Sequence, residues 1–215
     1  MRAISPGKLI LSGEHSVVYG QPALAISVNR YAETIIAAQL SKMVSFNLLN
    51  LRYSNSFTIQ TLRELKHRLV DRYQQFSAGQ CGIQNVLHMP FELAEFAFIS
   101  LFDHFKSKLL SGLDIKTAST IPVGCGMGSS SAIILSVLGA IAGYFKLNLK
   151  QEHFLSFGRE AENLQHGVSS GLDLFVSLHG GGAYFQEGKL QPRNFPDISL
   201  FVVNGYLNIL FAKEN

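Results

Sequence analysis

The chain of 215 residues contains no tryptophan, two cysteines and few charged residues. Charged side chains make up 15% of it and hydrophobic ones 47%, which excludes a disordered or strongly solvated chain. Cys81 and Cys125 cannot supply a disulfide framework, and the sequence has no Cys/His spacing typical of a metal site. The net charge of +3 gives no basis for nucleic-acid binding, although it suits a small anionic ligand.

Long hydrophobic runs are also lacking. The longest, from Ala132 to Phe145, is shorter than the ~18 residues that a membrane span needs. Residues Met1–Pro6 lack the apolar core of a signal peptide. We therefore expect a cytoplasmic, reducing location and no membrane partner. The length is sufficient for a sizeable hydrophobic core.

Hydrophobic periodicity predicts a chain with strands mostly in its first half and helices mostly in its second. This order is typical of an α+β protein in one compact domain. The predicted strands cover 8–11, 34–40, 44–51, 58–62, 113–117, 183–190 and 199–203. The predicted helices cover 62–76, 90–109, 132–145, 151–165 and 172–178.

The most informative segment is 121–131, which reads IPVGCGMGSSS. Glycines alternate at Gly124, Gly126 and Gly128, so the backbone can turn tightly and approach a ligand without side chains in between. The helix predicted at 132–145 would point its free N–H groups and the positive end of its dipole at that ligand. This arrangement favours a phosphate-binding loop, and the serine hydroxyls suit a magnesium ion that accompanies the phosphates.

Ordinary alternatives exist for this segment. A glycine cluster is often a simple turn, and serine is a common helix cap. Two specific alternatives fit poorly. A P-loop would need a lysine between Gly128 and Ser129, and the third glycine comes one residue too early for a dinucleotide-binding fingerprint.

Three charged residues elsewhere would complete a phosphate and magnesium site. Lys8 follows a Pro-Gly pair beside the first predicted strand, Glu162 lies late in a predicted helix, and Asp173 begins another. Each also has an ordinary interpretation as a surface lysine, a solvated helix charge or a first-turn acid. Their occurrence in one chain with the glycine loop favours the functional interpretation.

Three segments resemble the superfamily of galactokinase, homoserine kinase, mevalonate kinase and phosphomevalonate kinase, the GHMP kinases. They are PGKLILSGEHSVVYG at 6–20, the glycine loop at 121–131, and ENLQHGVSSGLD at 162–173. The resemblance extends from residue 5 to about 203. The first and third segments are most similar to mevalonate kinases. Galactokinases share Gly-Glu-His but continue with a different, Thr-Asp type sequence.

The resemblance implies a GHMP kinase N-terminal domain over residues 1–203 that uses ATP and Mg²⁺. The fold implied is the ribosomal protein S5 domain 2-like fold, a mixed sheet packed with helices. It implies that Asp173 is the catalytic base and that Lys8 lies beside it and the transferred phosphate. Ser130 and Glu162 match the magnesium ligands. The implied ATP-binding residues are Gly124, Gly126, Met127, Gly128, Ser129 and Ser130, and the implied substrate-binding residues are Glu14 and His15.

The sequence departs from the family pattern at three places. Ser131 stands where the family usually has Ala, and Leu174 stands where mevalonate kinases often have Asn. At 204–215 an atypical apolar tail takes the place where a C-terminal domain, with another glycine-rich loop, would begin. This tail predicts self-association, of which a homodimer is the simplest form, and weak kinase activity for the chain by itself.

The function implied is ATP- and Mg²⁺-dependent phosphoryl transfer to the hydroxyl of a small molecule, with conversion of mevalonate to 5-phosphomevalonate as the leading hypothesis. One alternative is a non-catalytic domain that binds a nucleotide or a partner. Another is a sibling kinase that acts on phosphomevalonate or a sugar.

Overall fold

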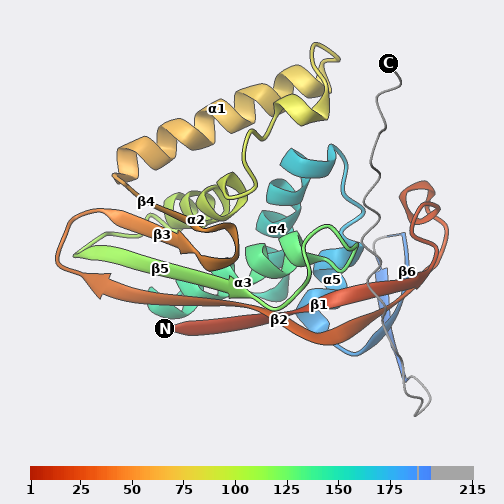
Figure 1. Ribbon diagram of the computed structural model, residues 1–215. Coiled ribbons are helices and arrows are strands. Elements are labelled where there is room, and N and C mark those ends of the chain that lie inside the picture. The colour runs from red at the N-terminus through yellow and green to blue at the C-terminus, as the bar shows by residue number, and fades with distance from the viewer. Residues whose placement is uncertain (188, 195–215) are drawn as a thin grey trace, which may run out of the picture.

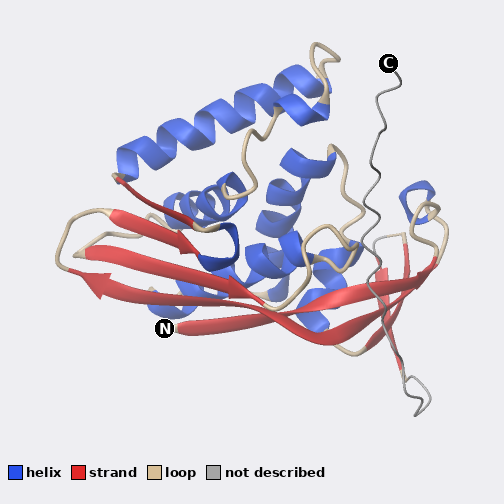
Figure 2. Ribbon diagram, in the orientation of Figure 1, coloured by secondary structure: helices blue, strands red, loops and turns tan. Residues whose placement is uncertain are grey.

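The computed structural model describes residues 1–187 and 189–194. A seven-stranded mixed sheet forms one layer, and helices cover it (Figures 1 and 2). The strands are β1 (Arg2–Ser12), β2 (Ala23–Gln39), β3 (Val44–Leu48), β4 (Tyr53–Phe57), β5 (Gly112–Ser119), β6 (Gly182–Gln186) and β7 (Lys189–Arg193). The helices are α1 (Ile59–Ser77), α2 (Glu92–His104), α3 (Ser129–Tyr144), α4 (Gln151–His166) and α5 (Leu172–His179).

Strand β2 is the centre of the sheet. It pairs antiparallel with β1 along one side, and with β5 and β6 along the other. The remaining strands extend the sheet at both ends, because β3 runs parallel to β5 and pairs with β4, while β7 pairs with β6. Side chains of β2 alternate between buried Ala32, Thr34 and Ile36 and the exposed Tyr31 and Ile35, as a sheet with one covered face requires.

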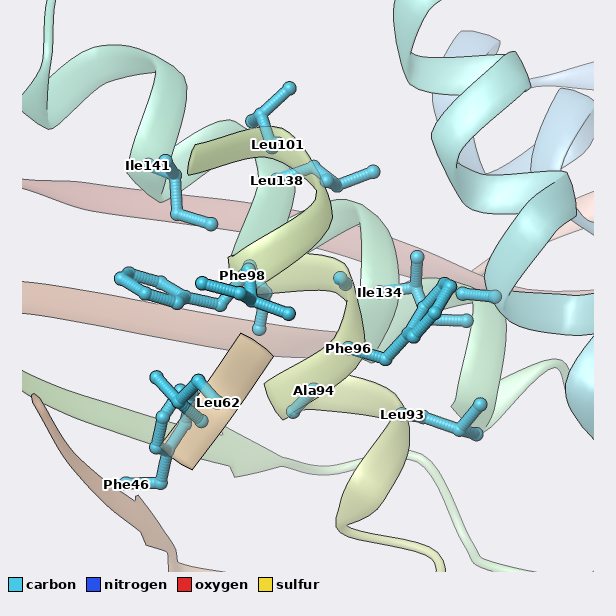
Figure 3. Close-up of a cluster of buried hydrophobic side chains, with 14 of the residues drawn as sticks. Phe46, Leu62, Leu93, Ala94, Phe96, Phe98, Leu101, Ile134, Leu138 and Ile141 are labelled. Carbon is cyan, nitrogen blue, oxygen red and sulfur yellow. The ribbon is translucent and has the colours of Figure 1, made fainter. Parts of the chain in front are cut away.

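The hydrophobic core lies between the sheet and the helices. Helix α3 packs on β1 and β2, and α2 packs in turn on α1, α3 and α4. Phe98 of α2 meets Phe46 of β3 edge to face, with ring centroids 5.6 Å apart (Figure 3). Both rings are fully buried. The core therefore fixes the position of α3, whose N-terminus follows the glycine loop.

The structure confirms the α+β class, the mixed sheet and all five predicted helices. The strand predicted at 58–62 is wrong, because the Thr58 hydroxyl caps helix α1 by accepting a hydrogen bond from the Thr61 N–H. The short strand β4 was not predicted. The prediction at 34–40 captured only about the last third of β2, which is one continuous strand of 17 residues.

The strand predicted at 199–203 and the tail at 204–215 lie outside the described residues. Within the described part of the chain, no helix combines the length and the hydropathy that crossing a membrane requires.

One carboxyl group lies inside this core. Glu95 of α2 is 1% exposed, and one of its oxygens accepts a hydrogen bond from the Tyr53 hydroxyl at 2.6 Å. Burial raises the pKa of Glu95 to about 7, the hydrogen bond from Tyr53 opposes this rise, and the nearby charge of Glu92 adds to it. The ionised carboxylate is therefore less stable here than in the unfolded chain.

This burial predicts a specific pH dependence of stability. Between pH 4.5 and about 7 the folded chain holds a proton on Glu95 that the unfolded chain has released, so the free energy of unfolding falls as the pH rises. A pKa change from 4.5 to about 7 corresponds to roughly 3 kcal/mol. The Glu95→Gln variant should lose this part of the pH profile in urea unfolding measured from pH 5 to pH 8. The exposed Glu160→Gln is the control, and profiles of wild type and Glu95→Gln that run parallel would contradict the assignment.

Candidate active site

Lys8 lies on β1 just after a register shift between Pro6 and Gly7, and its side chain is only 3% exposed. Its backbone N–H donates to the Met127 carbonyl at 3.0 Å, and its ammonium donates to the Gly126 carbonyl at 2.9 Å. A Cβ at Gly7 would come within 2.9 Å of that Met127 carbonyl. Glycine at position 7 is therefore what lets the glycine loop pack directly on β1.

The glycine loop adopts the backbone conformation that its sequence predicts. Gly124, Gly126 and Gly128 all have positive φ, at 76°, 66° and 67°. A Cβ built on Gly124 or Gly126 would have no neighbour within 4 Å, so both face open space. A Cβ on Gly128 would lie 2.8 Å from the Lys8 side chain, and helix α3 begins at the next residue, Ser129. The loop thus combines an open stretch of backbone at Gly124 and Gly126, the backbone cradle, with the buried ammonium of Lys8.

Asp173 lies in the first turn of α5, and its Oδ1 is 3.1 Å from the Lys8 ammonium. Burial raises the pKa of Asp173, while the charge and hydrogen bond of Lys8 oppose the rise and the charge of Glu14 adds to it. His166 also opposes the rise when it is protonated. Burial lowers the pKa of His166, which favours its neutral form. Asp173 is therefore a carboxylate with increased basicity beside a buried ammonium.

Glu162 of α4 is held by two serine hydroxyls. Ser131 of α3 donates to its Oε1, and Ser169 donates to its Oε2 at 2.5 Å. The Ser169 hydroxyl also accepts the N–H of Gly171, the residue that precedes α5. Burial raises the pKa of Glu162 to about 7, and both serine hydrogen bonds oppose the rise. A buried hydrogen-bond chain therefore connects α3, α4 and the start of α5.

Two neighbouring cavities meet at the Lys8–Asp173 pair. The larger, about 310 Å³, is lined by the glycine loop and by a set of apolar residues, the apolar slot, and the smaller, about 170 Å³, shares Lys8 with it. The residues that form the apolar slot are Leu48, Leu51, Pro90, Leu93, Val123 and Ile133. The residues that line both cavities are Lys8, Glu14, His166 and Asp173. A ligand in each cavity would thus have its reacting end beside the Lys8–Asp173 pair.

Most of the predicted site residues gather here. The glycine loop residues from Gly126 to Ser130, and Gly124, line the larger cavity, although the Met127 side chain itself is 5% exposed. Glu162 lines the smaller cavity. His15 is exposed and is absent from the residues that line either cavity.

The donor set suits a magnesium ion. Ser130 and Glu162 offer hard oxygen atoms, and Mg²⁺ commonly takes only one or two protein ligands and completes its shell with phosphate oxygens and water. The hydroxyl that donates to Glu162 belongs to Ser131, however, the residue after the predicted ligand. Within 1–187 and 189–194, the structure holds no cluster of three or more His, Cys, Asp or Glu residues that could bind a metal ion. A magnesium ion here would therefore need phosphate oxygens and water as further ligands.

Sequence reasoning missed the apolar slot and the contacts of Ser131, Ser169 and His166. The slot joins residues from β3, the turn after it, the start of α2 and the glycine loop, which are far apart in the sequence. No local pattern reveals such a set. The one available signal was that both serines lie in segments already quoted, Ser131 in the glycine loop and Ser169 in the segment 162–173.

Comparison with known proteins identifies the relatives of this chain. Residues 92–181 match the family described as "GHMP kinases N terminal domain". Over 204 residues the chain is 31% identical to the mevalonate kinase of Pyrococcus horikoshii, a match that covers 95% of this chain and 56% of that protein. The chain therefore spans little more than half the length of the curated relatives that it matches.

Solved structures share the fold. The Methanococcus jannaschii mevalonate kinase superposes with a TM-score of 0.74 and 24% identity, over 91% of this chain and 56% of that one. The Lactococcus lactis galactokinase, solved in complex with galactose, superposes with a TM-score of 0.67 and 19% identity, over 88% and 45%. Kinases with different acceptors thus share this fold, so the fold alone does not identify the acceptor.

The open cradle at Gly126 predicts that a single methyl group there weakens anion binding. In Gly126→Ala the new Cβ would occupy the space above the loop, and the positive φ would cost about 1–2 kcal/mol of stability. We expect the affinity for inorganic tripolyphosphate, measured by calorimetry, to fall at least tenfold in a folded variant.

Gly79→Ala is the matched control, because Gly79 also has a positive φ, of 73°, and free space around its Cβ. It follows α1 and lines neither cavity. Equal tripolyphosphate affinity in the two variants would show that the cradle does not hold phosphate.

Proposed function

The chain carries the N-terminal domain of the GHMP kinases, and on that premise we propose that it transfers the terminal phosphoryl group of ATP to the hydroxyl of a small molecule. The single observation that carries the proposal is the meeting of two cavities at Lys8 and Asp173. Phosphoryl transfer depends mainly on positioning two reactants in line and on neutralising charge. Two cavities that share a cation and a carboxylate suit this requirement.

In this proposal the larger cavity binds ATP. The apolar slot is suited to the flat, apolar faces of a purine ring. The backbone cradle at Gly124 and Gly126 and the N-terminus of α3 offer N–H groups to the phosphates. Ser130 and Glu162 would hold a Mg²⁺ ion, which when bound neutralises phosphate charge.

The smaller cavity binds the acceptor in this proposal. The acceptor hydroxyl gives its proton to Asp173 as its oxygen bonds to the phosphorus and the bond to the ADP oxygen breaks. Burial raises the pKa of Asp173, which improves it as a base. Lys8 is placed to stabilise the negative charge on the transferred group, and the Gly126 carbonyl keeps its ammonium directed at the loop.

The lining of the smaller cavity favours mevalonate among the candidate acceptors. Four of its residues are apolar, namely Ile10, Val17, Val168 and Leu172. Such walls suit a branched, methyl-bearing alcohol better than a polyhydroxylated sugar. Among the described residues that line it, Lys8 is the one permanent cation, beside the carboxyl groups of Glu14, Glu162 and Asp173. A phosphorylated acceptor such as phosphomevalonate would find little positive charge there.

Substitution of Asp173 tests its role as the base. Asp173→Asn should lower turnover by about two to four orders of magnitude, the usual range for acid–base catalysis, and should leave ATP affinity nearly unchanged. Asp114→Asn is the control, since Asp114 lies on β5 outside both cavities. Near-normal turnover in Asp173→Asn would remove this residue from the mechanism.

The acceptor is tested by ADP release in the presence of mevalonate, phosphomevalonate, galactose or homoserine. We expect mevalonate to give the highest kcat/KM, by at least tenfold over each of the others. A faster reaction with phosphomevalonate or galactose would identify a sibling kinase. Nucleotide binding without acceptor-dependent ADP release would identify the chain as a non-catalytic domain.

A further inference from the structure

We propose that Tyr53 and Glu95 form a clamp that holds the two walls of the apolar slot together, which makes them positioning residues for the nucleotide base. The inference rests on the proposed function, since it assigns the apolar slot to the base of ATP. It concerns two residues that line neither cavity. Tyr53 and Glu95 would therefore act on the nucleotide base only through the residues that line the larger cavity.

The two walls come from separate parts of the chain. Leu48 and Leu51 lie at the end of β3 and in the 3₁₀ turn Leu49–Leu51 that follows it. Pro90 and Leu93 lie at the start of α2. No covalent link fixes the distance between these walls, so the width of the slot depends on contacts made behind them.

Tyr53 supplies two such contacts. Its hydroxyl donates to Glu95 Oε1 at 2.6 Å, across 42 residues of sequence. Its ring stacks on that of Phe91 with centroids 3.7 Å apart and planes within 9° of parallel.

Both contacts are made by immediate neighbours of the wall residues. Tyr53 is the partner of Leu48 in the β3–β4 register, and Phe91 lies between Pro90 and the first turn of α2. One side chain therefore connects both walls. The turn before Pro90 is fixed independently, because Glu92 accepts the N–H groups of His88 and Met89.

A stabilising effect on the fold does not explain why position 95 carries a carboxyl group. Glu95 is 1% exposed, and within residues 1–187 and 189–194 its Oε2 has no hydrogen-bond partner. A buried polar atom without a partner destabilises a fold, and an apolar side chain of similar size would avoid this cost. What the carboxyl group provides is an acceptor for the Tyr53 hydroxyl, so its presence fits a role in positioning better than a role in stability.

The first test compares ATP with inorganic tripolyphosphate as ligands of the 215-residue chain by calorimetry. Tyr53→Phe keeps the stacked ring and removes only the hydrogen bond to Glu95. We expect its Kd for ATP to rise about three- to tenfold, the range for the loss of one hydrogen bond. Its Kd for tripolyphosphate should stay the same, because this ligand fills the cradle without the slot.

The second test separates positioning from stability. Glu95→Leu should weaken ATP binding as much as Tyr53→Phe does, while its Tm stays equal or rises. Glu95→Gln keeps an acceptor oxygen and should bind ATP within twofold of wild type. The double variant Tyr53→Phe/Glu95→Leu should bind ATP no more weakly than either single variant, because both remove one interaction.

The control is Tyr184→Phe, which removes a tyrosine hydrogen bond to Gln186 on β6, outside both cavities. It should leave both Kd values unchanged. Wild type that binds neither ATP nor tripolyphosphate would overturn the proposed function and the clamp with it. Wild type that binds ATP, with Tyr53→Phe binding it equally well, would overturn the clamp alone. Equal weakening of ATP binding and tripolyphosphate binding in Tyr53→Phe would also overturn it, because the substitution would then affect the whole larger cavity and not the apolar slot alone.

Discussion

The contact between the Lys8 ammonium and the Asp173 carboxylate is the interaction on which the rest of the site depends. It joins the first strand to the first turn of α5, and a second hydrogen bond joins Lys8 to the glycine loop at Gly126. The contact with Gly126 requires close packing of the loop on β1, which Gly7 and Gly128 permit because neither has a Cβ. The loop, the cation and the candidate base are therefore positioned as one unit.

The site is built at a cost to stability. Two carboxyl groups, Glu95 and Glu162, are almost fully buried, and burial raises the pKa of each to about 7. Such groups are common at functional sites, where fixed polar groups are needed before a ligand arrives. Glu162 is held by serines from two other segments, and Glu95 holds Tyr53 behind the apolar slot. The hydrophobic core between the sheet and helices α2 and α3 compensates for this cost.

Most elements of the fold were predictable from the sequence, because their signals are local, whereas the roles of Lys8, Glu162 and Asp173 were implied by the family resemblance and stay predictions. Alternating glycines ahead of an apolar helix predicted the loop, and Asp173 lies in the first turn of α5, just after the N-cap residue Gly171. The apolar slot was not predictable, because its walls come from segments that only the tertiary fold brings together. The strand predicted at 58–62 failed for a local reason, since a threonine that suits a strand also caps a helix. The pairing of Ser131 with Glu162 is a long-range contact between two helices, and no spacing indicates it.

The central claim is that Lys8 and Asp173 act as one catalytic unit at the meeting point of two cavities. A double-mutant cycle of Lys8→Met and Asp173→Asn, measured as kcat for acceptor-dependent ADP release, tests it most directly. Residues that act as a unit are strongly non-additive, so the double variant should lose no more than about tenfold beyond the worse single variant. Losses that multiply, so that the double variant falls by the product of the two single effects, would show that the residues act independently and would contradict the account.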